Sequence, residues 1–295
     1  MTEGATGNIY DLGYQRYTGA RLGRRHAIWA LYRESLRAAF GLGRRAAAKV
    51  APAVLILIAL APALLQVIGG LLGGGENMEI VRHDQYYGMV AFIVALYVAV
   101  IAPDIFGREQ RDRTVALFFT RAVSREDFVL ARFLALVTAM LLVTLAPQLV
   151  MFVGNALVAD SFGDHLRANA DQLLPIAGTA LLGSTLIASV GAAIAAQTPQ
   201  RAFATVGIVA AFLVTVFISL ILVESIGSLP GRLAVFVSPF AHIEGSTAWM
   251  FRSELGADSV VARSGFHLYY FPLAAVILTS ACYGLLLGRY RRLQP

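Results

Sequence analysis

The stretch FLALVTAMLLVTLAPQLVMFVGNALV (133–158) runs for 26 residues without a charged side chain. An α-helix rises about 1.5 Å per residue, so some 20 apolar residues cross the roughly 30 Å hydrocarbon core of a bilayer. A helix of this composition has no polar face to turn toward water. The stretch therefore predicts a membrane-spanning helix.

Five more stretches are long and apolar enough to cross, at 51–72, 86–106, 173–196, 202–223 and 268–287. The whole chain is 58% apolar and 14% charged, against about 25% charged in soluble domains. The first apolar run begins near Ala51, behind a 50-residue polar and arginine-rich segment, which does not fit a signal peptide. The single cysteine, Cys282, excludes an internal disulfide and a cysteine metal cage. The sequence predicts an all-α integral membrane protein with six transmembrane helices.

The segment 229–251 is apolar in part, but Pro230, Gly231, Arg232 and Ser238-Pro239 interrupt it. Proline and glycine break helices, and an arginine is costly inside the hydrocarbon. We expect re-entrant or surface-lying short helices here, on the external side between spans five and six, rather than a seventh crossing.

Basic residues predict the orientation. Nineteen of the 24 lie in the N-terminal segment, the 107–132 loop, the turn at Arg201 and the C-terminal tail, and five lie in the other loops. Because positive charge is retained in the cytoplasm, both termini are expected to be cytoplasmic. Two termini on one side require an even number of crossings, which agrees with six.

The N-terminal 1–49 region is expected to hold a cytoplasmic strap followed by an amphipathic helix at 24–43, and residues 50–295 to form the transmembrane domain. One face of that helix is apolar and the other carries Arg33, Glu34 and Arg37. Such a helix suits the headgroup layer, and the alternative is packing on a soluble partner. The apolar positions are Ile28, Leu31, Tyr32, Leu36, Ala39 and Phe40.

Small residues recur at every fourth position of the fourth span, at Ala180, Ser184, Ala188, Ala192 and Ala196. In a bilayer such a stripe lets a second helix approach closely. The partner helix is expected in the same chain, and a second copy is the alternative.

Apart from Asp104 and Glu224 at their boundaries, the predicted spans hold no Asp, Glu, Lys, Arg or His, which argues against a proton-coupled pump. The chain lacks the glycine-rich, lysine-containing loop that binds nucleotide phosphates, since its one lysine, Lys49, precedes a valine. No enzyme activity, cofactor or metal site is therefore predicted. The external histidines, His83, His165, His242 and His267, have no spacing that fixes a metal geometry.

The loop GREQRDRTVALFFTRAVSREDFVLAR (107–132) carries a charged run, a short apolar segment and then Ser124. Ser124 with Asp127 three residues later predicts a capping box that starts the next helix. The apolar segment 115–119 needs a cover, either the membrane surface or, as we prefer, a cytoplasmic partner.

This loop resembles that of the six-span permease subunits of type-2 ATP-binding-cassette (ABC) exporters. The family has an acidic residue, Gly-Thr, a leucine-rich turn and Pro-Val-Ser-Arg, and Glu109, Thr114, Leu117 and Val123-Ser124-Arg125 match it. Arg113 and Ala122 stand where glycine and proline are usual. The N-terminal stretch 10–24 and the external Ser238-Pro239-Phe240 with His242 are also similar, so the resemblance covers nearly the whole chain.

The resemblance implies a bacterial plasma-membrane permease that works with a second permease chain, identical or homologous, and two cytoplasmic ATP-binding subunits holding ATP and Mg²⁺. The 107–132 loop would couple to these subunits, and 225–267 would hold the external gate. The implied coupling residues are Glu109, Arg113, Thr114, Leu117, Phe118, Ser124 and Arg125, and the implied gate residues are Ser238, Pro239, Phe240 and His242. The alternatives are a stand-alone channel or carrier, and an anchor subunit that transports nothing.

Overall fold

The computed structural model describes residue 19 and residues 22–43, 47–74, 80–111 and 123–292. This part of the chain is helical and has no strand. Six helices are long and apolar enough to cross a membrane, as predicted. They are α2 (Ala47–Gly69, extended by a π-helical turn, η1, Gly70–Gly74), α3 (Tyr86–Phe106), α6 (Arg125–Val158), α8 (Leu173–Ala195), α9 (Arg201–Ser225) and α13 (Tyr270–Arg292).

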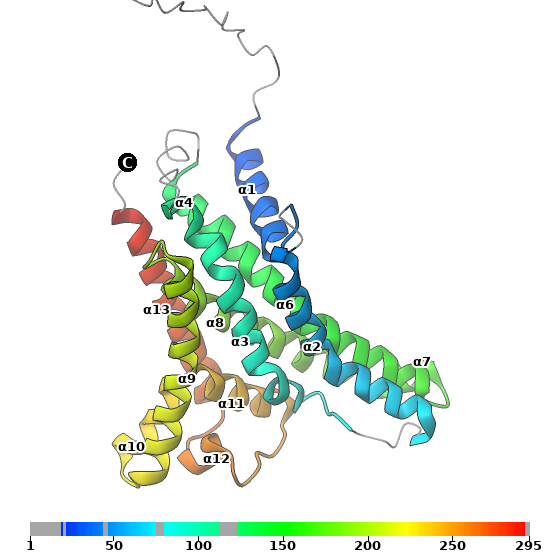
Figure 1. Ribbon diagram of the computed structural model, residues 1–295. Coiled ribbons are helices and arrows are strands. Elements are labelled where there is room, and N and C mark those ends of the chain that lie inside the picture. Colours follow the sequence, from blue (N-terminus) through cyan, green and yellow to red (C-terminus); the bar gives the residue numbers. More distant parts are fainter. Residues whose placement is uncertain (1–18, 20–21, 44–46, 75–79, 112–122, 293–295) are drawn as a thin grey trace, which may run out of the picture.

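Short helices lie at the two ends of this bundle (Figure 1). One end carries α1 (Arg24–Ala39), α4 (Arg108–Arg111) and the last turn of α13. The opposite end carries α7 (Phe162–Ala168), η3 (Ala170–Gln172), α10 (Leu229–Leu233), η4 (Ala234–Val237), α11 (Pro239–Phe251) and α12 (Val260–Ser264). The stretch 229–251 is thus broken into three short helices, which confirms that it contains no single helix long enough to cross.

Helix α8 lies at the centre of the bundle, where it packs on α3, α6, α9, α11 and α13. Its small-residue stripe is fully buried at all five positions, which confirms that the stripe packs within the chain. Two polar contacts join α8 to its neighbours α3 and α6. The Tyr87 hydroxyl donates to the Ala180 carbonyl over 3.3 Å, and the Thr144 and Ser184 hydroxyls lie 3.0 Å apart.

Helix α6 is longer than the predicted 133–158 span because it begins at Arg125. The predicted capping box is present: the Ser124 hydroxyl accepts from the Asp127 backbone N–H, and the Asp127 carboxylate accepts from the Ser124 N–H. At about 1.5 Å per residue its 34 residues extend roughly 51 Å, well beyond the hydrocarbon thickness. Figure 1 shows α6 running obliquely beside α2 toward α7.

Helix α1 packs lengthwise on α6 and α3. Its predicted apolar stripe faces the chain's own core, where Leu31 and Ala39 are buried and the other four residues are partly buried. The Tyr32 hydroxyl donates to Thr138 Oγ1 over 3.0 Å. Arg33, Glu34 and Arg37 are exposed, as predicted. The stripe is therefore covered by the transmembrane helices themselves, an arrangement that amphipathicity alone does not distinguish from lipid contact.

Candidate functional site

The predicted coupling segment divides between described and undescribed residues. Arg113, Thr114, Leu117 and Phe118 lie outside the described residues. Glu109 lies in α4, the short helix that continues from the end of α3. Ser124 and Arg125 are described, at the start of α6. The structure therefore fixes the two ends of the segment.

The α6 end of the segment is joined to the last turn of α13. Arg125 donates from Nη1 to the Arg291 carbonyl over 2.6 Å, and Arg291 forms an ion pair with Glu126. On the other side of α6, the Arg24 guanidinium of α1 forms two hydrogen bonds to the Asp127 carboxylate, at 2.8 and 2.9 Å. Paired hydrogen bonds of this kind fix orientation as well as distance. The first turn of α6 thus connects α1 to α13.

The α3 end of the segment is held by a buried arginine. Arg132, which the loop prediction of 107–132 left outside the spans, is only 3% exposed within α6. Its guanidinium donates to the Ile105 carbonyl at the end of α3 and lies 4.2 Å from the Phe128 ring centre. The Tyr290 hydroxyl of α13 donates to the neighbouring Phe106 carbonyl over 2.7 Å. These donors satisfy carbonyls that a helix end leaves without a partner in the helix.

The predicted gate residues meet at the opposite end of the molecule, around the start of α11. Ser238 is the N-cap of α11, and Pro239 occupies its first turn, where proline is well tolerated. The Phe240 ring stacks on Phe212 of α9, with ring centres 5.3 Å apart. The start of α11 is therefore packed directly on the fifth apolar helix.

His242 lies inside an aromatic cluster. It is 1% exposed, its ring stacks on Phe236 at 5.9 Å, and it packs edge-on against Phe271. Its Nε2 lies 3.0 Å from the Phe236 carbonyl. Burial lowers the His242 pKa to about 4, and the hydrogen bond to Phe236 opposes this only in part. The imidazole is therefore neutral at physiological pH and serves as a packing element.

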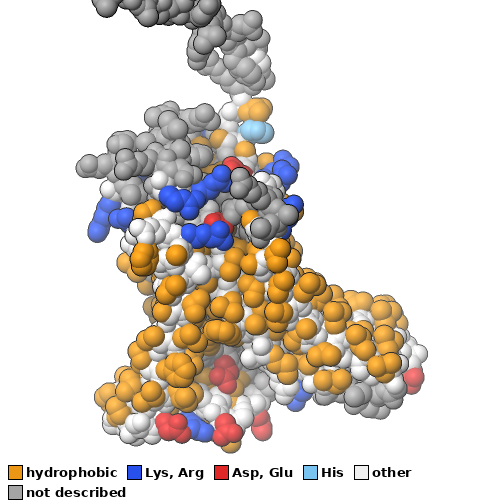
Figure 2. Space-filling view, in the orientation of Figure 1, with side chains coloured by type: hydrophobic (Ala, Val, Ile, Leu, Met, Phe, Trp, Pro, Cys, Tyr) orange, Lys and Arg blue, Asp and Glu red, His pale blue; other side chains and the backbone are white. Residues whose placement is uncertain are grey.

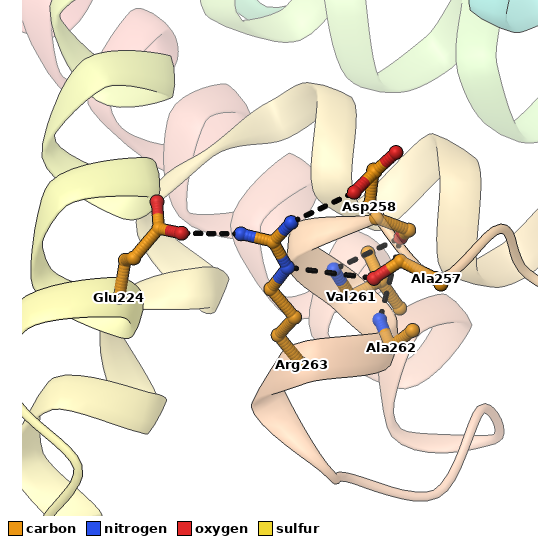
Figure 3. Close-up of polar contacts among 7 residues, drawn as sticks. Glu224, Ala257, Asp258, Val261, Ala262 and Arg263 are labelled. Carbon is orange, nitrogen blue, oxygen red and sulfur yellow. Dashed lines mark hydrogen bonds and ion pairs between the residues drawn. The ribbon is translucent and has the colours of Figure 1, made fainter.

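Arg263 links the end of α9 to the segment that precedes α13 (Figure 3). Its guanidinium forms ion pairs with Glu224 and, over 3.1 Å, with Asp258. A second arginine, Arg232, donates to the Ser264 carbonyl over 2.5 Å. Gly265 beside it adopts a φ of +66°, and an added Cβ would meet Arg232 at 2.6 Å, so this position requires glycine. The segment between α9 and α13 is thus tied to the end of α9 at several points.

A cavity of about 1010 Å³ opens between α3, α9, α11 and the loop 252–256. Its wall includes the predicted gate residue Phe240 together with Met89, Phe92, Glu244 and Arg252. The Glu244 carboxylate faces this cavity and is accessible to solvent, but the surrounding protein desolvates it and raises its pKa. An apolar wall that carries a carboxylate can bind an amphipathic molecule.

A second, polar cavity of about 320 Å³ lies between the ends of α2 and α6 and the loop before α3. Gln66 organises it: its side-chain oxygen accepts from the Ile80 and Val81 backbone N–H groups at 2.7 and 2.9 Å, and its Nε2 donates to Asn155. Sequence reasoning missed these amides because it searched the spans only for ionisable groups. Glutamine and asparagine inside an apolar run were the signal that could have found them.

The four histidines predicted to be external do not form a metal centre among the described residues, which contain no cluster of three or more His, Cys, Asp or Glu side chains able to hold an ion. His83 lies in the polar cavity and His242 in the aromatic cluster. Burial lowers the His83 pKa to about 4, while the neighbouring Gln148 amide and Asp84 oppose the shift.

Comparison with known proteins gives no family assignment. No protein-family model matches the chain, and no curated protein matches it. The six apolar helices indicate a multi-pass membrane protein.

Proposed function

We propose that the chain is the membrane-spanning permease subunit of an ABC exporter in the bacterial plasma membrane. Both termini are cytoplasmic, and two copies of a separate ATP-binding subunit dock on that side. A second permease chain, identical or homologous, completes the transport pathway. This chain hydrolyses no ATP itself.

The observation that carries the proposal is the mechanical linkage at the two ends of the 112–122 segment. One end follows α4, which continues from α3, and the last carbonyls of α3 accept from Arg132 and Tyr290. The other end is the capped start of α6, joined to α13 through Arg291. A docked partner that displaces this segment would move three apolar helices together, which is what coupling by rigid-body motion requires.

Two further features support the proposal. Helix α1 packs along α6 and leaves Trp29 55% exposed beside its arginines, and an aromatic residue next to basic ones is typical of a membrane–water interface. The broken helices of 229–251 lie between the fifth and sixth apolar helices and fit a re-entrant external gate. In the proposed cycle, ATP closes the paired ATP-binding subunits, and the coupling segments shift the helices between two states.

The first test is affinity purification of the tagged chain from its native host in mild detergent, followed by mass spectrometry. We expect a near-stoichiometric companion that carries a phosphate-binding loop and a vanadate-sensitive ATPase activity. Leu117→Asp and Phe118→Asp should abolish its recovery, whereas Leu22→Asp, the same type of change at an exposed position 66% accessible, should not. A chain that purifies alone even after crosslinking overturns the proposal in favour of a channel, carrier or anchor.

A further inference from the structure

The cavity between α3, α9 and α11 has the size of a ligand site. Its volume of about 1010 Å³ lies at the upper end of the roughly 300–1,000 Å³ that small-molecule sites occupy, so it exceeds what a metal ion or an amino acid needs. Figure 2 shows this face of the molecule hollowed between its two lower lobes, with acidic side chains in and around the hollow.

Part of the cavity wall is apolar and accessible. Met89 and Phe92 of α3 are 51% and 40% exposed, and Val216 of α9 and Phe240 of α11 complete this surface. A ligand that displaces water from an apolar concave surface gains about 25 cal/mol for each Å² of apolar area that leaves water. This part of the wall suits rings or alkyl groups.

Glu244 places a negative charge on the same wall. Phe240, Glu244 and Thr247 follow one another at helical spacing, so they share the face of α11 that lines the cavity. Among the described residues no ion pair involves Glu244, and only the Ser259 hydroxyl lowers its pKa against the effect of desolvation. The carboxylate is exposed on the cavity wall, so its charge is available to a ligand.

The other charged groups of the cavity do not supply that counter-charge. Arg82 and Asp84 pair with each other over 3.1 Å and cancel. Arg252 and Glu254, both on the loop 252–256, oppose each other in sign. The wall therefore keeps one net negative charge, carried where the apolar surface is. This negative charge would repel an anionic ligand and attract a cationic one.

We propose that this cavity binds an amphiphile with a cationic head, whose charge pairs with Glu244 and whose apolar body lies against Phe92 and Phe240. The binding itself needs no ATP-binding subunit. That the bound cation is exported rests on the proposed function.

The test compares two probes of nearly the same size and shape, tetraphenylphosphonium and tetraphenylborate, by equilibrium dialysis against the purified full chain in an uncharged detergent. We expect saturable binding of the cation and none of the anion. Glu244→Gln should weaken cation binding about tenfold or more, the loss of one favourable charge pair of about 1.4 kcal/mol. Glu34→Gln, an exposed carboxylate on α1, is the matched control and should leave binding unchanged.

Two results overturn the inference: equal binding of both probes, or full affinity in Glu244→Gln. If Glu244→Gln does not fold, Val216→Trp, which fills the cavity from α9, should abolish binding while thermal unfolding confirms that the variant is folded. Retained affinity in that variant would also overturn it. If the unsubstituted chain binds no cation but an ATP-binding companion is recovered, this inference is refuted and the proposed function stands. If the chain binds the cation but no companion is recovered, the proposed function is refuted and the cation site stands.

Discussion

Arg132 is the residue that holds the end of α3 to α6. Its guanidinium is buried, donates to the Ile105 carbonyl and covers the Phe128 ring. Removing it leaves a buried carbonyl short of a donor and opens a cavity beside an aromatic ring, each of which costs free energy.

We therefore expect Arg132→Ala to destabilise the protein by about 2–3 kcal/mol, measured as a lower melting temperature in detergent. Arg132→Lys should recover only part of this loss, because an ammonium cannot reproduce the planar contact with Phe128. Arg33→Ala, on the exposed face of α1, is the control. A melting temperature equal to that of the control would show that the Arg132 contacts contribute nothing.

The two buried histidines make stability depend on pH in one direction. Burial lowers the pKa of both His83 and His242 to about 4. In the unfolded chain they titrate near 6.5, so between about pH 6.5 and 4 the unfolded state binds protons that the folded state does not. Stability should fall as the pH decreases through this window, by an upper bound of roughly 3 kcal/mol for each histidine.

Thermal unfolding from pH 8 to 4 measures this effect. The charged neighbour of His83 is Asp84, which attenuates the effect, while His242 is surrounded by aromatic rings. His83→Asn and His242→Asn should each flatten the curve, and His26→Asn at the other end of the molecule controls for the loss of one imidazole. If the melting temperature of the double variant still falls as steeply with decreasing pH, the two histidines do not cause the pH dependence.

At the scale of the elements, α2 and α6 approach closely because position 154 has no side chain. A Cβ at Gly154 would lie 2.2 Å from Val67 Cγ2 and 3.0 Å from Cγ1. Gly154→Ala should therefore force the helices apart and destabilise the protein by about 1–3 kcal/mol.

Val67→Ala removes both methyl groups, so the double variant should recover most of the loss that Gly154→Ala causes. Gly284→Ala, where an added Cβ meets nothing within 4 Å, should be neutral or slightly stabilising because alanine favours helix. Additive losses in the double variant, measured by thermal unfolding, would mean that this contact does not set the approach of α2 and α6.

The sequence predicts helix identity well and helix ends less well, for physical reasons that α6 illustrates. Hydropathy detects the part of a helix that the bilayer selects, and it placed this span at 133–158. The backbone instead begins the helix at the Ser124 capping box, eight residues earlier, because hydrogen bonding rather than hydropathy decides where a helix starts. Helix α13 likewise continues beyond its predicted end at 287, to Arg292.

At the scale of the whole molecule, six crossings follow from composition and spacing, whereas the cavities do not. Phe240 and Glu244 are near one another in the sequence, but Phe92 is more than a hundred residues away, and only the packing of α3 against α11 brings them together. Arg132 was likewise interpreted as a loop charge, because its hydrogen-bond acceptor, the Ile105 carbonyl, belongs to another helix. Sequence reasoning thus named Phe240 by resemblance and could not predict the cavity wall that it shares with α3.

The orientation of the molecule in the membrane can be tested directly. Figure 2 shows arginine and lysine side chains gathered at the end that carries α4, and acidic side chains at the opposite end. Because positive charge is retained in the cytoplasm, residue 34 on α1 should face the cytoplasm and residue 164 on α7, three crossings later, should face outward.

The single cysteine permits a clean experiment. In a Cys282→Ser background, Asp164→Cys should react with a membrane-impermeant maleimide in intact cells, and Glu34→Cys only after permeabilisation. Both side chains are exposed in the structure, so lack of labelling cannot be attributed to burial. Reversed labelling would place the 107–132 segment outside the cell, where no ATP-binding subunit could reach it. If both cysteines react from outside, α2, α3 and α6 do not all cross the membrane.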